Sequence, residues 1–196
     1  MNRVTADDKP APKKRMTRTR DALCNALLLL LEEKAFEQIT VKEITARANI
    51  GYATFFRRYS DKDGLLHDLV EQEIRRLITM SLPLLYSVDT LASTQALCSY
   101  VWEHRKLWTA LLTGGAAAIV KEEYLKQALK VAEDDTHDDG WLPAELSVTF
   151  SVTATNEILT WWLKQERPAP VNKIAEIINR LVIAPVYYQA GENPAK

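Results

Sequence analysis

The amino-acid sequence predicts an all-α protein, and three observations support this fold class. Only six glycines occur in 196 residues, and 47% of the residues are hydrophobic, which is enough for a buried core. Long segments repeat apolar residues at spacings of three and four positions, which is the period of an amphipathic helix. We find no convincing pair of strands between these segments. The length suits one ordinary domain or two small ones.

The first predicted element is a helix over residues 17–34. It follows residues 1–16, whose polar, Pro- and Lys-rich composition predicts a flexible basic arm. The apolar residues of this helix form one broad stripe, which indicates a face that packs against neighbouring helices. They are Leu23, Ala26, Leu27, Leu30 and Leu31.

Two short helices are predicted next, over residues 41–48 and 52–59. Thr40 and Glu43 have the spacing of a capping box, in which the Thr40 hydroxyl accepts a hydrogen bond from the Glu43 amide and the carboxylate reaches back to Thr40. Residues 49–51 separate the two helices, because Asn tolerates left-handed backbone angles and Gly has no side-chain restraint.

A long fourth helix is predicted from its cap at Asp61 to about residue 82, where Pro83 stops or kinks it. Glycines, prolines and an acidic cluster then mark the breaks between further helices. These helices are predicted over residues 90–102, 104–112, 116–133, 144–165 and 171–189.

Charge and composition limit the classes of partner. Residues 1–62 contain 13 Lys and Arg against 8 Asp and Glu, whereas the remainder contains 12 against 18. The basic N-terminal part suggests an anionic partner such as nucleic acid, although scatter of the charges would give a similar split. The longest unbroken apolar run, residues 26–31, is far shorter than the roughly 20 residues of a membrane span. The N-terminus lacks the apolar segment of a secretion signal, so we expect a cytoplasmic protein with no membrane partner.

The cysteines and histidines give no sign of catalysis. Cys24 and Cys98 have neither the spacing of a disulfide framework nor that of a zinc site, so we expect buried free thiols. His67, His104 and His137 lie apart, with no phosphate-binding loop, nucleophile elbow or paired metal motif nearby. We therefore expect no enzyme activity and no cofactor.

The two short helices and the three-residue turn between them have the arrangement of a helix-turn-helix, whose second helix enters the DNA major groove. Phe55 and Tyr59, four positions apart, are predicted to hold this helix against the core, so that the residues around them face outward. Arginine presents a rigid fork of donors to guanine or phosphate, and Thr54 offers a hydroxyl to phosphate or a methyl group to thymine. Lys62 is predicted to clamp a phosphate beside the outward amides of the next helix. The predicted DNA-binding residues are Thr17, Arg18, Thr40, Lys42, Tyr52, Ala53, Thr54, Phe56, Arg57, Arg58 and Lys62.

Residues 23–66, which include ALLLLLEEKAFEQITVKEITARANIGYATFFRRYSDKDGLL, closely resemble the N-terminal domain of the tetracycline-repressor (TetR) family of bacterial regulators. The resemblance has no gaps and covers the amphipathic helix, the Thr-Val start, the second and third helices and the exit into the fourth. It implies that Thr40 caps its helix and contacts phosphate. It also implies that Tyr52, Ala53 and Thr54 face bases and backbone, and that Lys62 binds phosphate.

The sequence departs from the family pattern at five positions. Phe56 stands where the family usually has a tyrosine whose hydroxyl binds phosphate, and Arg58 replaces a nearby Tyr or His and could supply that contact instead. Asn49 occupies the usual turn glycine, and Gly51 occupies the usual serine cap. Ala35 occupies the glycine that ends the first helix, where a left-handed backbone would cost an alanine about 1 kcal/mol.

The resemblance implies an N-terminal three-helix helix-turn-helix DNA-binding domain, residues 17–62, and a C-terminal helical ligand-binding and dimerisation domain, residues 63–196. It further implies a homodimeric repressor, whose two recognition helices enter successive major grooves of a palindromic operator. The last two long helices would then form the dimer interface. The candidate interface residues are Phe150, Ala154, Ile158, Trp161, Ile174, Ile178, Leu181 and Pro185.

The same resemblance implies a small-molecule effector, which binds inside the C-terminal helices, moves the fourth helix and changes the spacing of the recognition helices. The aromatic residues of this part favour a hydrophobic or aromatic effector, although aromatics at helical spacing are usually plain core. The candidate pocket residues are Tyr86, Tyr100, Trp102, His104, Trp108, Tyr124 and Phe150.

Three alternatives remain. The spacing of the two short helices alone also fits a plain helical hairpin with a solvated basic face. The acidic residues 133–139 could hold a divalent cation, but no fixed ligand spacing is present, so a solvated loop without metal is favoured. A helical adaptor that binds a protein partner instead of DNA would explain the missing hydroxyl at Phe56. Such an adaptor predicts binding that is insensitive to salt, whereas a repressor loses affinity for DNA steeply as salt rises.

Overall fold

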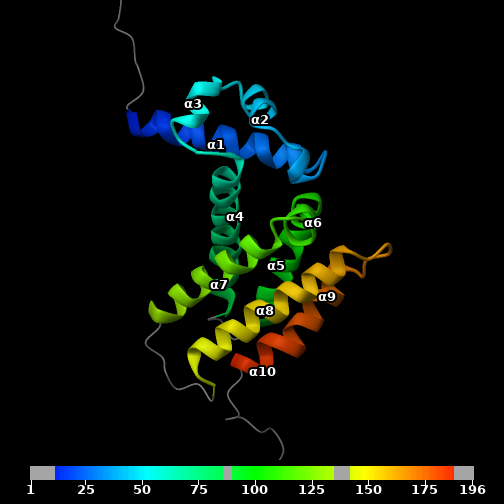
Figure 1. Cartoon of the computed structure of the whole chain (residues 1–196). Helices are drawn as coiled ribbons and strands as arrows, with labels where there is room; N and C mark the ends of the chain where they lie inside the picture. The colour runs from blue at the N-terminus through cyan, green and yellow to red at the C-terminus, as the bar shows by residue number, and fades with distance from the viewer. Residues whose placement is uncertain (1–11, 86–89, 135–141, 188–196) are drawn as a thin grey trace, which may run out of the picture.

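A computed structural model describes residues 12–85, 90–134 and 142–187, and the elements in these ranges are all helical (Figure 1). The predicted all-α fold is therefore confirmed. In chain order, the elements are α1 (Pro12–Leu31), the 3₁₀ helix η1 (Phe36–Gln38), α2 (Val41–Ala48), α3 (Tyr52–Phe56), α4 (Lys62–Leu85), α5 (Thr90–Glu103), α6 (Arg105–Thr113), α7 (Ala117–Asp134), α8 (Ala144–Leu163), α9 (Val171–Ile178), the π-helix η2 (Asn179–Ile183) and α10 (Ala184–Tyr187).

The helices form two groups that α4 connects. Figure 1 shows α1, α2 and α3 together at one end of the molecule, with α4 leading away from them into the group of α5 to α10. Within the second group, α4 packs against α5 and α7, and α8 packs against α6, α7 and α9. The architecture is thus an N-terminal helix-turn-helix unit followed by a C-terminal helical unit.

The predicted inner stripe of the first helix is buried. Its five residues are at most 5% exposed, and they pack with apolar residues from α2, α3 and α4. Ile44 and Phe55 bring α2 and α3 onto this core, because both side chains are 0% exposed. Short helices such as α2 and α3 are marginal alone, so this burial is what stabilises them.

The turn between α2 and α3 forms as the sequence predicts. The Thr40 and Glu43 capping box is present, and α2 spans the predicted residues. Asn49 has φ 53° and ψ 46°, which is the left-handed conformation expected of a residue that replaces the turn glycine. The α-helical part of α3 ends at Phe56, three residues earlier than predicted, and the chain continues through hydrogen-bonded turns to Tyr59.

The corner between α1 and α2 differs from the prediction. Ala35 has φ −61° and ψ 146°, so its backbone is extended and the expected left-handed strain is absent there. The helix ends early, at Leu31, and η1 then turns the chain toward α2. Ile39, which is 1% exposed, anchors the end of this corner in the core.

The first, fourth and last helices also differ from the sequence-based expectation. The first helix begins at Pro12, inside the predicted flexible arm, and α4 continues past Pro83 to Leu85. The predicted last helix contains a π-helical segment, in which the Ala184 amide donates to the carbonyl of Asn179. Pro185 follows directly and has no amide hydrogen to donate, so a wider turn is a usual way to accommodate the break.

The C-terminal unit has an aromatic core. Trp108 and Trp162 are 1% and 0% exposed, and the Trp162 indole donates to the carbonyl of Ala169 at 2.8 Å. Cys24 and Cys98 are buried free thiols, as predicted. Among the described helices, none has the length and apolar character that crossing a membrane requires.

Candidate nucleic-acid interface and effector region

The outward surface of α3 combines aromatic and cationic side chains. Tyr52 and Phe56 are 56% and 45% exposed, and their rings meet edge to face with centroids 5.0 Å apart. Phe55 and Tyr59, by contrast, are 0% and 9% exposed and hold the helix against the core. The structure therefore places α3 as predicted, with its aromatic anchors inward and an aromatic pair at the surface.

The arginines that follow this pair have different surroundings. Arg57 is exposed, and its Nη2 donates to the Thr54 hydroxyl at 2.8 Å, so these two side chains form one polar surface. Arg58 is only partly exposed, because its Nε donates to the Tyr59 hydroxyl at 3.2 Å and its guanidinium lies over the Tyr59 ring. Of the two arginines, Arg57 is thus the better placed to contact DNA directly.

A partly buried ion pair beneath α3 links α1 to α4. Arg20 donates to Asp68 through Nε at 2.8 Å and through Nη2, and the Tyr59 hydroxyl donates to the same carboxylate. Burial disfavours the charged form of Asp68, but the hydrogen bonds from Arg20 and Tyr59 outweigh it and lower the pKa of this carboxyl. Sequence reasoning missed this pair, since its members lie on different helices and no local spacing connects them.

The Thr40 end of α2 is also built from polar contacts. The Thr40 hydroxyl accepts from the Glu43 amide at 3.3 Å, and the Glu43 carboxylate accepts from the Thr40 amide at 2.9 Å. Lys34 donates to the other Glu43 oxygen at 2.5 Å. The Lys34 hydrogen bond, followed by those from Thr40, lowers the pKa of Glu43 to about 2. Four further residues that were predicted to bind DNA are exposed: Thr17 and Arg18 on α1, Lys42 on α2 and Ala53 on α3.

Lys62, the predicted phosphate clamp, is partly exposed, and its ammonium group contacts the corner between α1 and α2. Its Nζ donates to the carbonyl oxygens of Phe36, Glu37 and Ile39 at 2.9, 3.2 and 3.0 Å, and it lies 4.5 Å from the centroid of the Phe36 ring. An ammonium group has three donors, so each donor already has an acceptor in this arrangement. Sequence reasoning could not find these partners, because backbone carbonyls carry no residue identity.

Three of the predicted pocket residues come together in the C-terminal unit. The Tyr100 ring lies 4.6 Å from the His104 ring and 6.4 Å from the Trp108 ring, measured between centroids. The Tyr100 hydroxyl donates to Glu73 at 2.5 Å. Glu73 is 2% exposed and also accepts from Arg76 at 3.0 Å, yet sequence reasoning did not single it out.

This polar and aromatic cluster contains an unsatisfied donor. The indole nitrogen of Trp108 is buried and has no hydrogen-bond acceptor among the described residues. Burial, followed by the hydrogen bond to Glu73, raises the pKa of Tyr100 to about 12, so its hydroxyl stays protonated and donates. Buried donors without acceptors are rare in folded proteins and often mark a site that a ligand or water completes.

The remaining pocket candidates lie elsewhere. Trp102 stacks on Trp162 with centroids 5.1 Å apart, and Phe150 is 46% exposed on α8. Tyr124 is partly buried on α7, and Tyr86 lies outside the described residues. The structure therefore does not gather the predicted set around a single pocket.

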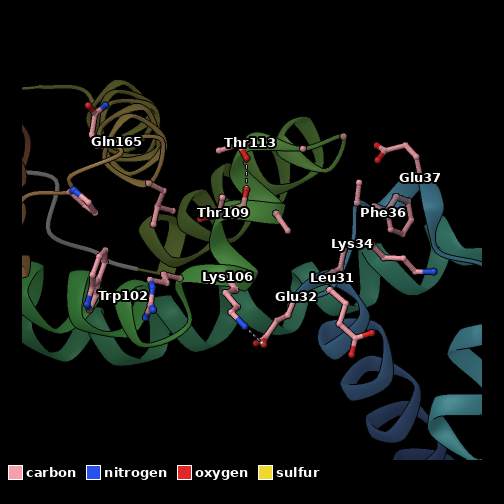
Figure 2. Close-up of a pocket in the computed structure, with 18 of the residues that line it drawn as sticks. Leu31, Glu32, Lys34, Phe36, Glu37, Trp102, Lys106, Thr109, Thr113 and Gln165 are labelled. Carbon is pink, nitrogen blue, oxygen red and sulfur yellow. Dashed lines mark hydrogen bonds and ion pairs between the residues drawn. The ribbon is translucent and has the colours of Figure 1, made fainter.

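A cleft of about 620 Å³ separates the α1–η1 corner from α6 and the end of α8. Figure 2 shows Phe36 and Glu37 at one end of this cleft and Trp102 at the other, with Lys106 and Glu32 between them. The Lys106 ammonium lies 3.8 Å from the Glu32 carboxylate, which is a loose ion pair across the two helical units. A side chain at Gly115 would approach Glu37 Oε1 to 2.4 Å, so Glu37 lies directly against the turn between α6 and α7.

The predicted dimer residues divide into surface and core. Phe150, Trp161 and Leu181 are 46%, 53% and 64% exposed, which is unusual for large apolar side chains. Ile174 and Ile178 are 0% and 1% exposed within one chain, so both side chains pack in its core. The other predicted residues are intermediate or exposed, namely Ala154, Ile158 and Pro185.

Only the start of the predicted acidic loop can be placed. Glu133 and Asp134 end α7, and residues 135–139 lie outside the described ranges. Within the described ranges, no group of three or more His, Cys, Asp or Glu side chains could hold a metal ion.

Comparison with known proteins places this geometry among helix-turn-helix regulators. Residues 24–69 match the model of the bacterial regulatory proteins of the tetR family. The HTH-type transcriptional regulator YxbF of Bacillus subtilis is 23% identical over 171 residues, which cover 83% of this chain and 44% of YxbF. The chain thus spans less than half of that relative's length.

Solved structures show the same fold. A TetR transcriptional regulator from Streptococcus agalactiae superposes with a TM-score of 0.62 at 22% identity, over 87% of this chain and 96% of that chain. The regulator FadR from Bacillus subtilis, in complex with stearoyl-CoA, gives a TM-score of 0.62 at 13% identity, over 85% of this chain and 98% of that chain.

Proposed function

We propose that this chain is a TetR-family transcriptional regulator that binds DNA as a homodimeric repressor, and that a small-molecule effector releases it from its operator; the match of residues 24–69 to the family model supports this proposal. The observation that carries this proposal is the surface of α3, where Tyr52, Phe56 and Arg57 face outward from a helix that Phe55 and Tyr59 anchor. A short helix with this division of faces fits the DNA major groove.

Contacts to phosphate and to bases come from different helices in this proposal. Lys42 on α2 and Arg18 on α1 are exposed cations that suit phosphates, which position the protein without reading sequence. Tyr52 and Thr54 lie at the start and in the middle of α3, and Arg57, which hydrogen-bonds Thr54, directly follows the helix, so all three are placed where base edges would lie. The operator is therefore double-stranded DNA read through its major groove.

The exposed apolar face of α8 and η2 supports a symmetric dimer. Phe150, Trp161 and Leu181 would be buried by the same face of a second copy, as a two-fold axis requires. A dimer presents two copies of α3, and we propose that they read the two halves of a palindromic operator one helical turn apart.

The cluster of Glu73, Tyr100 and Trp108 supports an effector site among α4, α5 and α6. A ligand acceptor would satisfy the unpaired Trp108 indole, while the surrounding rings would bury an apolar or aromatic body. Glu73 lies on α4, which begins beneath the DNA-binding helices. We propose that binding at this cluster displaces α4 and so changes the separation of the two copies of α3.

The experiment that tests this function is a titration of the purified protein against its own upstream DNA, at several salt and protein concentrations. We expect saturable binding of two protomers per site, with an affinity that falls steeply as salt rises, because bound phosphates release counterions. If a folded protein fails to bind both this region and a random-sequence DNA library at low salt, the proposal is wrong. A helical adaptor for a protein partner would then be the better interpretation.

A further inference from the structure

We propose that Asp68 is a positioning residue for DNA binding, which holds the end of the recognition segment through the Tyr59 hydroxyl and so ties the orientation of this segment to α4. The recognition segment is α3 together with the turns that follow it to Tyr59. This inference rests on the proposed function, since it names the contact through which α4 would control the DNA-binding surface.

The Tyr59 hydroxyl lies between two charged groups. It donates to Asp68 Oδ2 and accepts from Arg58 Nε at 3.2 Å. A hydroxyl has a single proton to donate, so this proton is committed to the carboxylate. Burial, followed by the hydrogen bond to Asp68, raises the pKa of Tyr59, so the hydroxyl stays protonated at neutral pH. A charge-assisted hydrogen bond therefore joins the end of the recognition segment to α4.

Asp68 is itself held in place from a third helix. Arg20 on α1 donates to Oδ2 of Asp68 through Nε at 2.8 Å, to Oδ1 through Nη2, and to the Asp68 backbone carbonyl at 3.4 Å. The Arg20 and Asp68 side chains are only 22% and 20% exposed, so salt and water screen this ion pair less than a surface pair. Because Arg20 binds both the backbone and the side chain of Asp68, this carboxylate keeps a fixed position between α1 and α4.

The place of Asp68 along α4 connects this contact to regulation. Asp68 lies near the start of α4, at the end that adjoins α1 and α3 in Figure 1, and Glu73 of the proposed effector cluster lies further along the same helix. A displacement of α4 would therefore move Asp68 and, through its hydroxyl, Tyr59. The Tyr59 ring packs against Phe55 of α3, with centroids 5.6 Å apart, so the recognition helix would follow.

The sign of one charge change separates positioning from simple electrostatics. A carboxylate close to DNA repels phosphates, so its removal in Asp68→Asn would by itself strengthen binding to every duplex. A positioning role predicts the opposite for the operator. The uncharged amide makes weaker hydrogen bonds with Arg20 and Tyr59, and the recognition segment is then held less firmly.

The test titrates full-length wild type, Asp68→Asn and Tyr59→Phe against the operator and against an unrelated duplex. Tyr59→Phe removes the linking hydroxyl and changes no charge. For both variants, we expect the ratio of operator to unrelated-duplex affinity to fall by about ten-fold or more, because a displaced recognition helix loses base contacts, and base contacts carry the specificity. In Asp68→Asn, the affinity for the unrelated duplex should not fall.

Asp63→Asn is the matched control, since it removes the same charge from an exposed position in the first turn of α4. It should leave the ratio of the two affinities unchanged. The double variant of Asp68→Asn and Tyr59→Phe tests whether the two residues act through one link. We expect it to lose little more specificity than either single variant, whereas independent effects would add.

Circular dichroism and thermal unfolding give the folded fraction of each variant, and Tyr59→Phe keeps the inference testable if Asp68→Asn does not fold. A merely structural contact would lower the folded fraction and weaken both affinities in proportion, which would overturn the inference. It is also overturned if Asp68→Asn strengthens operator binding, or if Tyr59→Phe keeps the wild-type ratio. Wild-type protein that binds neither duplex would instead refute the proposed function.

Discussion

At the scale of single residues, Phe56 is the position where the recognition surface departs from the family pattern. Its ring is 45% exposed beside Tyr52, so a para hydroxyl could be added without entering the core. We expect Phe56→Tyr to strengthen binding to all DNA sequences by about 2- to 10-fold per protomer, since a hydrogen bond contributes about 0.5–1.5 kcal/mol. Titrations of the operator and of a scrambled duplex at one salt concentration measure this gain. If the affinity for neither duplex rises, the ring at position 56 does not lie close to the DNA backbone.

Glu43 makes the corner between α1 and α2 sensitive to acid. Its pKa is lowered to about 2 in the folded protein, from an ordinary value of 4.5, by Lys34 and then by Thr40. The unfolded chain therefore takes up this proton more readily. The stabilisation is present in full above pH 4.5 and is lost as the pH falls towards 2.

Denaturant unfolding of the wild type and of Glu43→Gln at a series of pH values tests this dependence. We expect the variant to unfold at lower denaturant concentration near pH 7, with the difference shrinking between pH 4.5 and 2. Glu103→Gln, which removes an exposed carboxylate from α5, is the control for loss of charge elsewhere. A difference that stays constant over this pH range would contradict the assigned role of the carboxylate.

At the scale of elements, the turn between α6 and α7 contains a matched pair of glycines. A Cβ at Gly114 would lie 2.6 Å from the backbone oxygen of Ala110, whereas a Cβ at Gly115 would meet only the end of the flexible Glu37 side chain. We expect Gly114→Ala to destabilise the protein by about 1–3 kcal/mol, because backbone must move. Gly115→Ala should have a smaller effect, since Glu37 can rotate away. Thermal unfolding of the two variants compares them, and equal losses would show that the backbone contact is not the cause.

Local signals made much of this fold predictable. The bounds of α2 and the left-handed Asn49 follow from the capping box and from the turn chemistry of adjacent residues, and the structure confirms both. The corner at Ala35 was not predictable, because the chain avoids strain there by ending α1 early and inserting η1. The π-helical segment before Pro185 likewise depends on how the last helix packs.

The candidate site, too, could be predicted from the sequence only where local spacing determines it. The outward face of α3 could be inferred because helical spacing alone divides its aromatics into anchors and surface residues. The partners of Lys62 could not, since they are backbone oxygens more than 20 positions earlier in the chain. Glu73 was missed for a related reason. A buried carboxylate is stabilised by Tyr100 from another helix, and the sequence around Glu73 resembles an ordinary charged helix face.

At the scale of the whole molecule, the exposed apolar face of α8 and η2 predicts self-association. Leu181 is 64% exposed, so Leu181→Glu should change the stability of one chain by only about 0.5 kcal/mol. In a dimer, the same substitution would bury two unpaired carboxylates, and we expect it to give monomers in sedimentation velocity at micromolar concentration. Leu29→Glu, which alters an exposed leucine on α1, is the control and should leave association unchanged. A monomeric wild type would remove this face from consideration as an interface.

The two buried cysteines can report the opening of two different parts of the molecule. Cys24 lies in α1 and Cys98 in α5, and burial raises the pKa of each thiol to about 12. Alkylating reagents attack the thiolate, which is almost absent in the closed state at neutral pH. Each thiol is therefore labelled only when its own helix opens. Mass spectrometry of the two labelled peptides thus measures separately how fast the DNA-binding unit and the C-terminal unit open. Adding DNA should slow the labelling of Cys24, and adding an effector should change the labelling rate of Cys98.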